Sequence, residues 1–144
     1  MRKSYGVAAI SAAFVLGFLT RGVVPGEGVL QAQSGRVFEL RTYTAPDGKL
    51  GELNARFRNH TMRIFQKHGM TNVAYFTPQD APLSQNTLVY LISHANRDAA
   101  KQSWAAFQKD AEWQKVAQES QVNGKIVASV VSQFLVPTDY SPMK

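Results

Sequence analysis

Alternation of apolar and polar positions marks four segments of the chain as β-strands. Each segment is rich in β-branched and aromatic residues, which suit a pleated, half-buried surface. The predicted strands span residues 36–44, 72–78, 86–94 and 126–136. Prolines at positions 78 and 82 flank the polar stretch between the second and third strands, as expected of a hairpin loop.

Helical periodicity appears in two stretches, one between the first and second predicted strands and one between the third and fourth. In the first stretch, Asp47 is the expected N-cap and Gly69 the expected end of the helix. Between them, one face collects Leu50, Leu53, Phe57, Thr61, Ile64, Phe65 and His68. On this helix, the basic residues Arg56, Arg63 and Lys67 are expected to form the solvent-exposed face.

The second helical stretch begins near Asn96 or Asp98 and ends at Asn123-Gly124, with an expected break at Lys109-Asp110. Its large aromatic residues recur at helical spacing. They are expected to anchor the core and a subunit contact rather than to bind a cofactor, and they are Trp104, Phe107 and Trp113.

The order β-α-β-β-α-β predicts an α+β fold of the ferredoxin-like type. In this fold an antiparallel four-stranded sheet carries both helices on one face. Residues 34–144 are expected to form this single domain. The second face of the sheet would be bare, and an apolar bare face is commonly covered by another subunit. The chain is therefore expected to be a homodimer.

Strand parity divides the polar and apolar residues between the two faces of the predicted sheet. In the first strand, the apolar pair Phe38 and Leu40 is assigned to the helix side. The same sorting of the other strands, ambiguous only in the fourth, gathers several polar side chains on the open face: Glu39, Arg41, Tyr43, Tyr75, Tyr90, His94 and Gln133. Such a face has three uses, which stay open: a subunit contact, a small-molecule pocket or a catalytic site.

The N-terminal segment, residues 1–33, has the features of an export signal. A basic start is followed by an apolar run over residues 5–20 and by small residues further on. The run is somewhat shorter than the roughly 20 residues that span a bilayer comfortably. We therefore expect export to the periplasm or the exterior, with residues 1–33 cleaved off or retained as a membrane anchor. The anchor is the only membrane contact expected.

Composition removes several functional classes. The chain has no cysteine, which excludes thiolate catalysis, iron–sulfur clusters and cysteine-ligated zinc. The net charge is +6, but the basic residues are scattered and no nucleic-acid motif accompanies them, so no nucleic-acid partner is expected. None of the three histidines, His60, His68 and His94, forms a close-spaced metal-binding pair. We expect no metal and no cofactor.

Three stretches together resemble the NIPSNAP family over residues 36–141: "FELRTYTAPDGKLGEL", "FRNHTMRIFQKHGMTNVAYFTP" and "SWAAFQKDAEWQKV". The resemblance implies a dimeric α+β barrel, in which two ferredoxin-like units pack sheet to sheet. One departure is Ala111, because the family often has proline there. Without the proline, the break in the second helix is expected to be weaker.

The resemblance does not supply a biochemical activity, because that of the family is largely uncharacterised. Related dimeric barrels include cofactor-free monooxygenases and isomerases. By that analogy, Arg41 would hold a carboxylate or enolate, a tyrosine would hydrogen-bond it, and His94 or His60 would act as a base. We expect binding of a small molecule in the barrel lumen. The alternatives are an enzyme of the cofactor-free oxygenase or isomerase type and a non-catalytic structural or interaction module.

Overall fold

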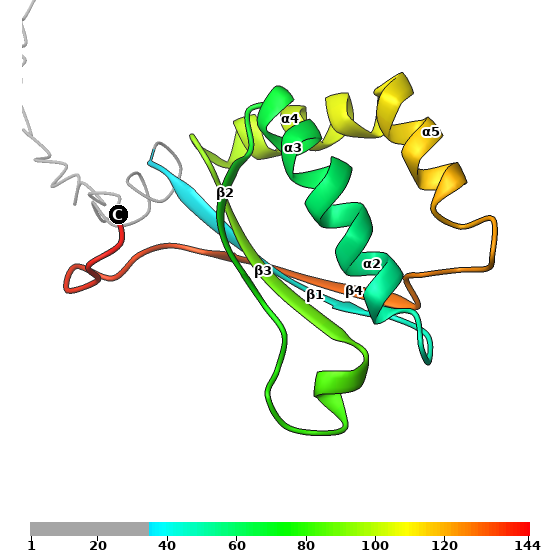
Figure 1. Cartoon of the computed structure of the whole chain (residues 1–144). Coiled ribbons are helices and arrows are strands. Elements are labelled where there is room, and N and C mark those ends of the chain that lie inside the picture. Colours follow the sequence, from blue (N-terminus) through cyan, green and yellow to red (C-terminus); the bar gives the residue numbers. More distant parts are fainter. Residues whose placement is uncertain (1–34) are drawn as a thin grey trace, which may run out of the picture.

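A computed structural model describes residues 35–144, so the predicted signal peptide or anchor over residues 1–33 lies outside the described residues. The four strands form one antiparallel sheet in the order β2-β3-β1-β4 (Figure 1). Their bounds are Val37–Thr44 for β1, Thr71–Phe76 for β2, Thr87–His94 for β3 and Ser129–Leu135 for β4. This strand order is that of the ferredoxin-like fold, as predicted.

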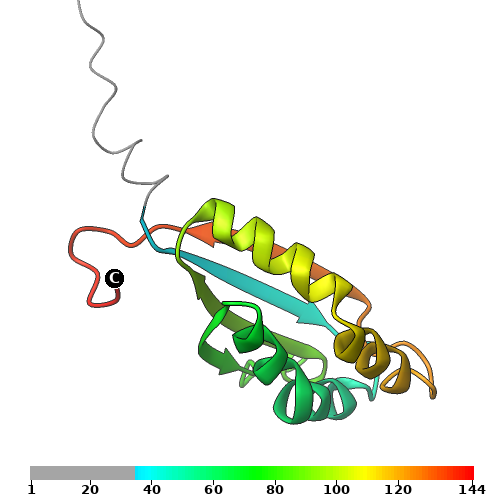
Figure 2. The ribbon, with the colours of Figure 1, turned by 90° about the horizontal axis from the view of Figure 1, so that it is seen from above.

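The two helical stretches lie on one face of this sheet, as Figures 1 and 2 show from two directions. The first helical stretch comprises α2 (Leu50–Arg56), a π-helical turn η1 (Phe57–Thr61) and α3 (Met62–Lys67). The second comprises α4 (Arg97–Lys109) and α5 (Ala111–Glu119). A short 3-10 helix, η2 (Leu83–Gln85), lies in the loop between β2 and β3. None of the helices in residues 35–144 is long and apolar enough to cross a membrane.

The predicted helix ends are correct at three places and wrong at two. One error is the end of α5, which lies at Glu119 and not at Asn123-Gly124. The Asn96 side chain caps α4 by accepting a hydrogen bond from the Ala99 N–H at 2.8 Å, and Gly69 ends α3 with a φ of +77°. Asp110 separates α4 from α5 in an extended conformation, although alanine and not proline follows it. Asp47 is not an N-cap, because a turn at Gly48 delays the start of α2 to Leu50.

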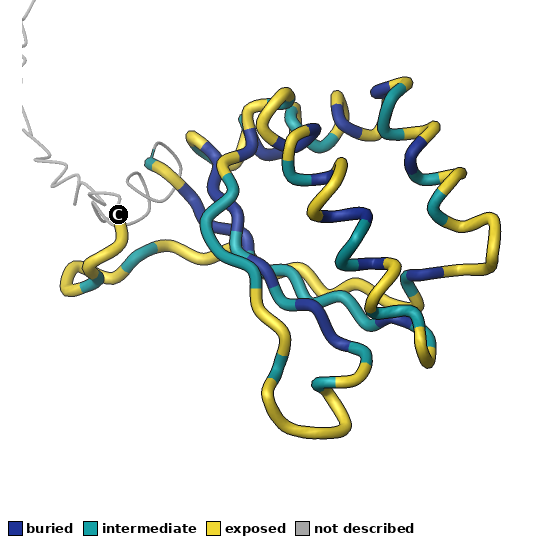
Figure 3. The backbone as a smooth tube through the Cα atoms, in the orientation of Figure 1, coloured by how far each residue is buried: buried dark blue, intermediate teal, exposed yellow. Residues whose placement is uncertain are grey.

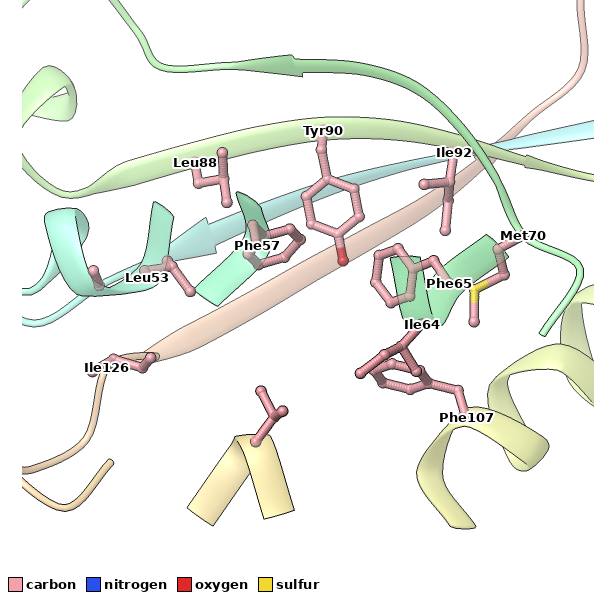
Figure 4. Close-up of a cluster of buried hydrophobic side chains, with 12 residues drawn as sticks. Leu53, Phe57, Ile64, Phe65, Met70, Leu88, Tyr90, Ile92, Phe107 and Ile126 are labelled. Atoms are coloured by element: carbon pink, nitrogen blue, oxygen red, sulfur yellow. The ribbon is translucent and has the colours of Figure 1, made fainter. Parts of the chain in front are cut away.

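The core lies between the sheet and the helices (Figure 4). Leu88, Tyr90 and Ile92 of β3 point from the sheet toward the helices. The first helical stretch and α4 supply the opposing side chains, which include Leu53, Phe57, Ile64, Phe65 and Phe107. The predicted apolar face of the first helix is therefore the face that packs on the sheet.

The predicted assignment of β1 residues to the two faces is wrong. Glu39 lies directly opposite Ile92, Arg41 opposite Tyr90 and Tyr43 opposite Leu88. Directly opposed residues in an antiparallel pair project from the same face. The polar residues of β1 therefore face the helices, and Tyr75, Tyr90 and His94 lie on that side as well. The alternation pattern did not identify the helix side of the sheet, because β3 carries apolar residues on both of its faces.

The outer face of the sheet, turned away from the helices, mixes apolar and hydroxyl side chains. The apolar ones include Phe38, Leu40, Phe76, Val89, Leu91, Val131 and Leu135, and the hydroxyl ones include Thr42, Thr44, Thr87 and Ser93. Gln133 lies opposite Leu40 and shares this face, as predicted. Val130 and Phe134 of β4 lie on the helix side, also as predicted, yet β4 is exposed along its whole length (Figure 3). The helices therefore shield the centre of the sheet more completely than its β4 edge.

Candidate functional site

A buried carboxylate, Glu39, organises the polar interior between the sheet and the helices. It is only 1% exposed and accepts hydrogen bonds from three other elements and from its own strand. Arg41 Nη1 lies at 2.7 Å and Ser132 Oγ at 2.6 Å from Oε1. Trp104 Nε1 lies at 2.7 Å and His94 Nε2 at 3.0 Å from Oε2. One carboxylate thus joins β1, β3, β4 and α4.

These contacts determine the ionisation of Glu39 and the tautomer of a neutral His94. Burial by itself would raise the pKa of Glu39, but the hydrogen bonds from His94, Ser132, Trp104 and Arg41 lower it from 4.5 to about 2. Glu39 is therefore ionised at neutral pH and can only accept hydrogen bonds. The proton of a neutral His94 consequently lies on Nε2, and its Nδ1 is left as a buried acceptor without a partner.

Arg41 is hydrogen-bonded to the buried Glu39 and is itself partly exposed to solvent. Its guanidinium lies 4.2 Å from the centroid of the Trp104 ring, and its Nη2 lies 3.5 Å from the Tyr43 hydroxyl. The side chain keeps 16% of its surface exposed, whereas its Nε is buried and has no hydrogen-bond partner. The Arg41 side chain therefore extends from the buried Glu39 carboxylate to a partly exposed position.

Arg56 is a second interior arginine, although the sequence predicted it to be solvent-exposed. It is 7% exposed, and its guanidinium lies 5.2 Å from the centroid of the Trp113 ring. The guanidinium makes one long hydrogen bond, 3.5 Å from Nη1 to Ser120 Oγ, and no carboxylate of the described residues pairs with it. The prediction is correct for Arg63 and Lys67, which are exposed.

The π-helical turn accounts for this difference between Arg56 and the two later basic residues. Arg56 lies three positions after the buried Leu53 and therefore on the same helix face. The next turn, η1, contains an additional residue, which rotates the following helix by about 100° relative to a regular one. Arg63 and Lys67 are consequently displaced from the Arg56 face and point to solvent.

Three tyrosines line the space between the two arginines. The rings of Tyr75 and Tyr90 stack with centroids 5.4 Å apart, and Tyr43 meets Tyr90 edge-on at 5.3 Å. Burial lowers the pKa of both Arg41 and Arg56, and nearby Tyr43 and Tyr90 raise it; the net shift is upward for Arg41 and downward for Arg56. Tyr43 and Tyr90 therefore act on the pKa of both guanidinium groups.

Four buried polar atoms of this interior lack a hydrogen-bond partner: Arg41 Nε, Arg56 Nε, Tyr90 Oη and His94 Nδ1. Buried polar groups in proteins are almost always paired, so four unpaired atoms in one region require an explanation. Two arginines and one ionised carboxylate also leave this interior with an excess of positive charge. We name this set of residues, with Glu39, Tyr43 and Trp104, the interior cluster.

Most of the predicted site residues meet in the interior cluster or beside it, but Gln133 does not, because it is exposed on the outer face of the sheet. His60 is exposed on η1 and lines a cavity that Arg56 also lines. Sequence reasoning missed Arg56 and Ser132. The signal for Ser132 was its place between Val130 and Phe134 on the inward parity of β4. Within residues 35–144, no three histidine or acidic side chains gather as a metal site requires.

Comparisons with known proteins agree with this fold. A NIPSNAP family protein of unknown function from Agrobacterium tumefaciens gives a TM-score of 0.67 at 18% identity, covering 77% of this chain and 96% of its own. A second one from the same organism gives 0.66 at 24%, covering 76% and 99%. SnoaB, a cofactor-independent oxygenase from Streptomyces nogalater, gives 0.51 at 12%, covering 75% and 98%. No curated protein matches the chain.

Identities this low show a common fold and carry no function. The sequence model of the NIPSNAP family, in contrast, matches residues 38–142, which is most of the chain and includes all four strands. The chain therefore belongs to the NIPSNAP family.

Proposed function

We propose that this exported NIPSNAP protein is a homodimer that binds a small molecule between the sheet and the helices of each subunit. The four unpartnered buried atoms of the interior cluster carry this proposal. A buried donor or acceptor without a partner costs about 1–3 kcal/mol. A bound molecule that pairs with these atoms removes that cost, and its binding thereby stabilises the folded protein.

The surroundings of these atoms fit a ligand site. Small-molecule sites are mostly apolar and carry a few oriented polar groups. Here Tyr75, Phe57 and the two tryptophans supply aromatic surface, while two guanidinium groups and the Tyr90 hydroxyl supply donors. The ligand would present acceptors to these groups and one donor to His94 Nδ1.

Replacement of Tyr90 by phenylalanine separates a ligand site from an empty interior. In an empty protein, Tyr90→Phe deletes an unpaired hydroxyl and should leave stability unchanged or raise it. If a ligand accepts a hydrogen bond from that hydroxyl, the variant should retain at least about fivefold less ligand. Native mass spectrometry of residues 34–144, followed by release of bound molecules, measures the retention. Tyr140→Phe is the control, because Tyr140 is 84% exposed.

The proposal would be contradicted if the wild-type protein retained no ligand, or if Tyr90→Phe retained as much ligand as the wild type. The same spectra report the mass of the assembly. The exposed apolar residues on the outer face of the sheet, such as Phe76 and Val131, support a homodimer, because exposed apolar surface is unfavourable in water unless another molecule covers it. A wild-type protein that is monomeric at micromolar concentration would contradict that part of the proposal.

A second candidate function is proton transfer to and from a bound carbon acid. The buried pair of Glu39 and His94 favours it, because the carboxylate orients the imidazole and leaves Nδ1 as a base. An isomerase would return the proton to another carbon. A cofactor-free monooxygenase would let the carbanion react with O2, keeping one oxygen atom in the product and releasing the other as water.

Mass spectrometry under ¹⁸O2 tests this second candidate on the molecule released from the wild-type protein. Turnover by an oxygenase adds one ¹⁸O atom, and an isomerase changes retention time without changing mass. His94→Asn should abolish either change while the protein still binds the molecule. An unchanged molecule, or a His94→Asn variant as active as the wild type, would rule this candidate out.

A further inference from the structure

A cavity of about 380 Å³ opens in the helical layer, away from the Glu39 end of the interior cluster. It lies between α2 with η1 on one side and α5 with its following turn on the other, and these helices run side by side in both ribbon views. Its lining includes Arg56, Asn59, His60, Val116 and Ser120. Arg56 is the most buried charged residue of the lining, so its guanidinium forms part of the inner wall.

Two acidic residues line the cavity, yet neither compensates the charge of Arg56. Glu52 accepts a hydrogen bond from Lys49 at 2.7 Å, and Glu119 lies 3.8 Å from Lys115. The Arg56 guanidinium is left with the Trp113 ring, one long contact to Ser120 and an unpartnered Nε. A buried charge without a counter-ion is strongly unfavourable, and an anion from outside the chain would supply one.

The rest of the lining restricts the kind of anion. The planar guanidinium fork matches a carboxylate or a phosphate. The carboxylates of Glu52 and Glu119 lie on the same cavity and repel a second negative charge, which disfavours a phosphate dianion. Ala55, Val116 and Val122 offer apolar surface for the remainder of the molecule.

We propose that this cavity binds a monocarboxylate with a short apolar body, its carboxylate on Arg56 and its body against the apolar wall. This inference deepens the proposed function and rests on it, because Arg56 belongs to the interior cluster. The π-helical turn supports it as well, since η1 brings Asn59 and His60 to the cavity beside Arg56, and π-helical turns are frequent at functional sites.

The two tryptophans of the chain make the position of a bound carboxylate measurable. Trp113 lies against Arg56, whereas Trp104 lies against Arg41. Hexanoate is titrated into ¹⁵N-labelled protein, with hexanamide as the uncharged analogue and hexyl phosphate as the dianion. We expect hexanoate to shift the indole signal of Trp113 more than that of Trp104. It should also bind at least tenfold more tightly than either analogue, which corresponds to about 1.4 kcal/mol in binding free energy.

Variants of the two neighbouring arginines complete the test. Arg56→Met should weaken hexanoate binding at least about tenfold. Arg58→Met should leave binding unchanged, because Arg58 is exposed on η1 and does not line the cavity. Arg56→Lys provides a folded comparison if the methionine variant does not fold. It keeps the charge but loses the fork, and a severalfold weaker binding is expected.

Absence of hexanoate binding at millimolar concentration, equal binding of hexanamide, or full affinity in both Arg56 variants would overturn the inference. These results are distinguishable from failure of the proposed function. If Tyr90→Phe loses a co-purified molecule while hexanoate does not bind, the small-molecule function stands and the carboxylate site does not. If Arg41→Met, but not Arg56→Met, loses hexanoate, the acid lies at the Trp104 end of the interior instead.

Discussion

Glu39 is the residue on which the polar interior depends, and its contribution to stability should depend on pH. Its pKa is depressed from 4.5 to about 2, so the stabilisation is complete above pH 4.5 and is lost as the pH falls toward 2. A shift of this size corresponds to about 3 kcal/mol. Glu39→Gln should therefore lower the free energy of unfolding by about that amount at pH 7.

Urea unfolding at pH 7, 4.5 and 3 measures this effect in both proteins. The difference between wild type and Glu39→Gln should narrow as the pH falls from 4.5 to 3, because the Glu39 carboxylate of the unfolded wild-type chain becomes protonated there while that of the folded protein stays ionised. Asp110 also has a lowered pKa, because it accepts hydrogen bonds from Lys67, Trp113 and His68. Its contribution to stability is the same in the wild type and in Glu39→Gln, so it cancels in the difference between them. A difference that stays constant with pH would refute the role assigned to the Glu39 carboxylate.

The sequence predicted which residues of β1 share a face of the sheet, but it did not predict which of the two faces that is. Alternation along β1 grouped Glu39, Arg41 and Tyr43 on one face, and the register confirms the grouping. The direction of that face was wrong, because the rule that apolar residues face the helices fails when the interior holds a polar network and the outer face also carries apolar residues. Arg56 was missed for a related reason: a buried, unpaired arginine contradicts the usual preference for exposure.

At the scale of an element, the ends of the helices follow local chemistry that the sequence displays. Gly69 adopts a positive φ, which permits the Met70 N–H to donate to the Phe65 carbonyl at 3.0 Å and closes α3. Asp110 caps α5 by accepting from the Trp113 N–H at 3.0 Å, which is why the helix breaks without a proline at position 111. The π-helical turn has no such signal, and it changed the exposure of the following basic residues.

Two glycine substitutions should have opposite effects on stability. Gly69→Ala forces a Cβ into the left-handed region and should destabilise the protein by about 1–2 kcal/mol. Gly51 lies inside α2 with open space around it, so Gly51→Ala should stabilise by about 0.5–1 kcal/mol. Thermal and urea unfolding of the two variants give the signs directly. A stabilising Gly69→Ala would show that the end of α3 does not require a left-handed residue.

At the scale of the whole molecule, the sheet separates two environments. Its helix side holds the interior cluster, and its outer face carries aliphatic and aromatic side chains beside several threonines. The element order alone predicted the fold, because the connections of a β-α-β-β-α-β chain leave few arrangements. The corrected faces strengthen the expectation of a homodimer, since the surface left without helices carries exposed apolar residues such as Phe76 and Val131.

Adjacent valines on β4 provide a test of the homodimer in which one variant is the control of the other. Val131 is 57% exposed on the outer face, and Val130 is 41% exposed on the helix side of the same strand. Lysine at position 131 would place two charges in a two-fold interface, so Val131→Lys should raise the dimer dissociation constant at least about tenfold. Val130→Lys adds the same charge but points away from the interface, and it should leave the constant unchanged. Sedimentation velocity over a concentration series measures both. Equal weakening by the two lysines would mean that β4 joins the subunits by its edge, and no weakening by either would place the subunit contact away from β4.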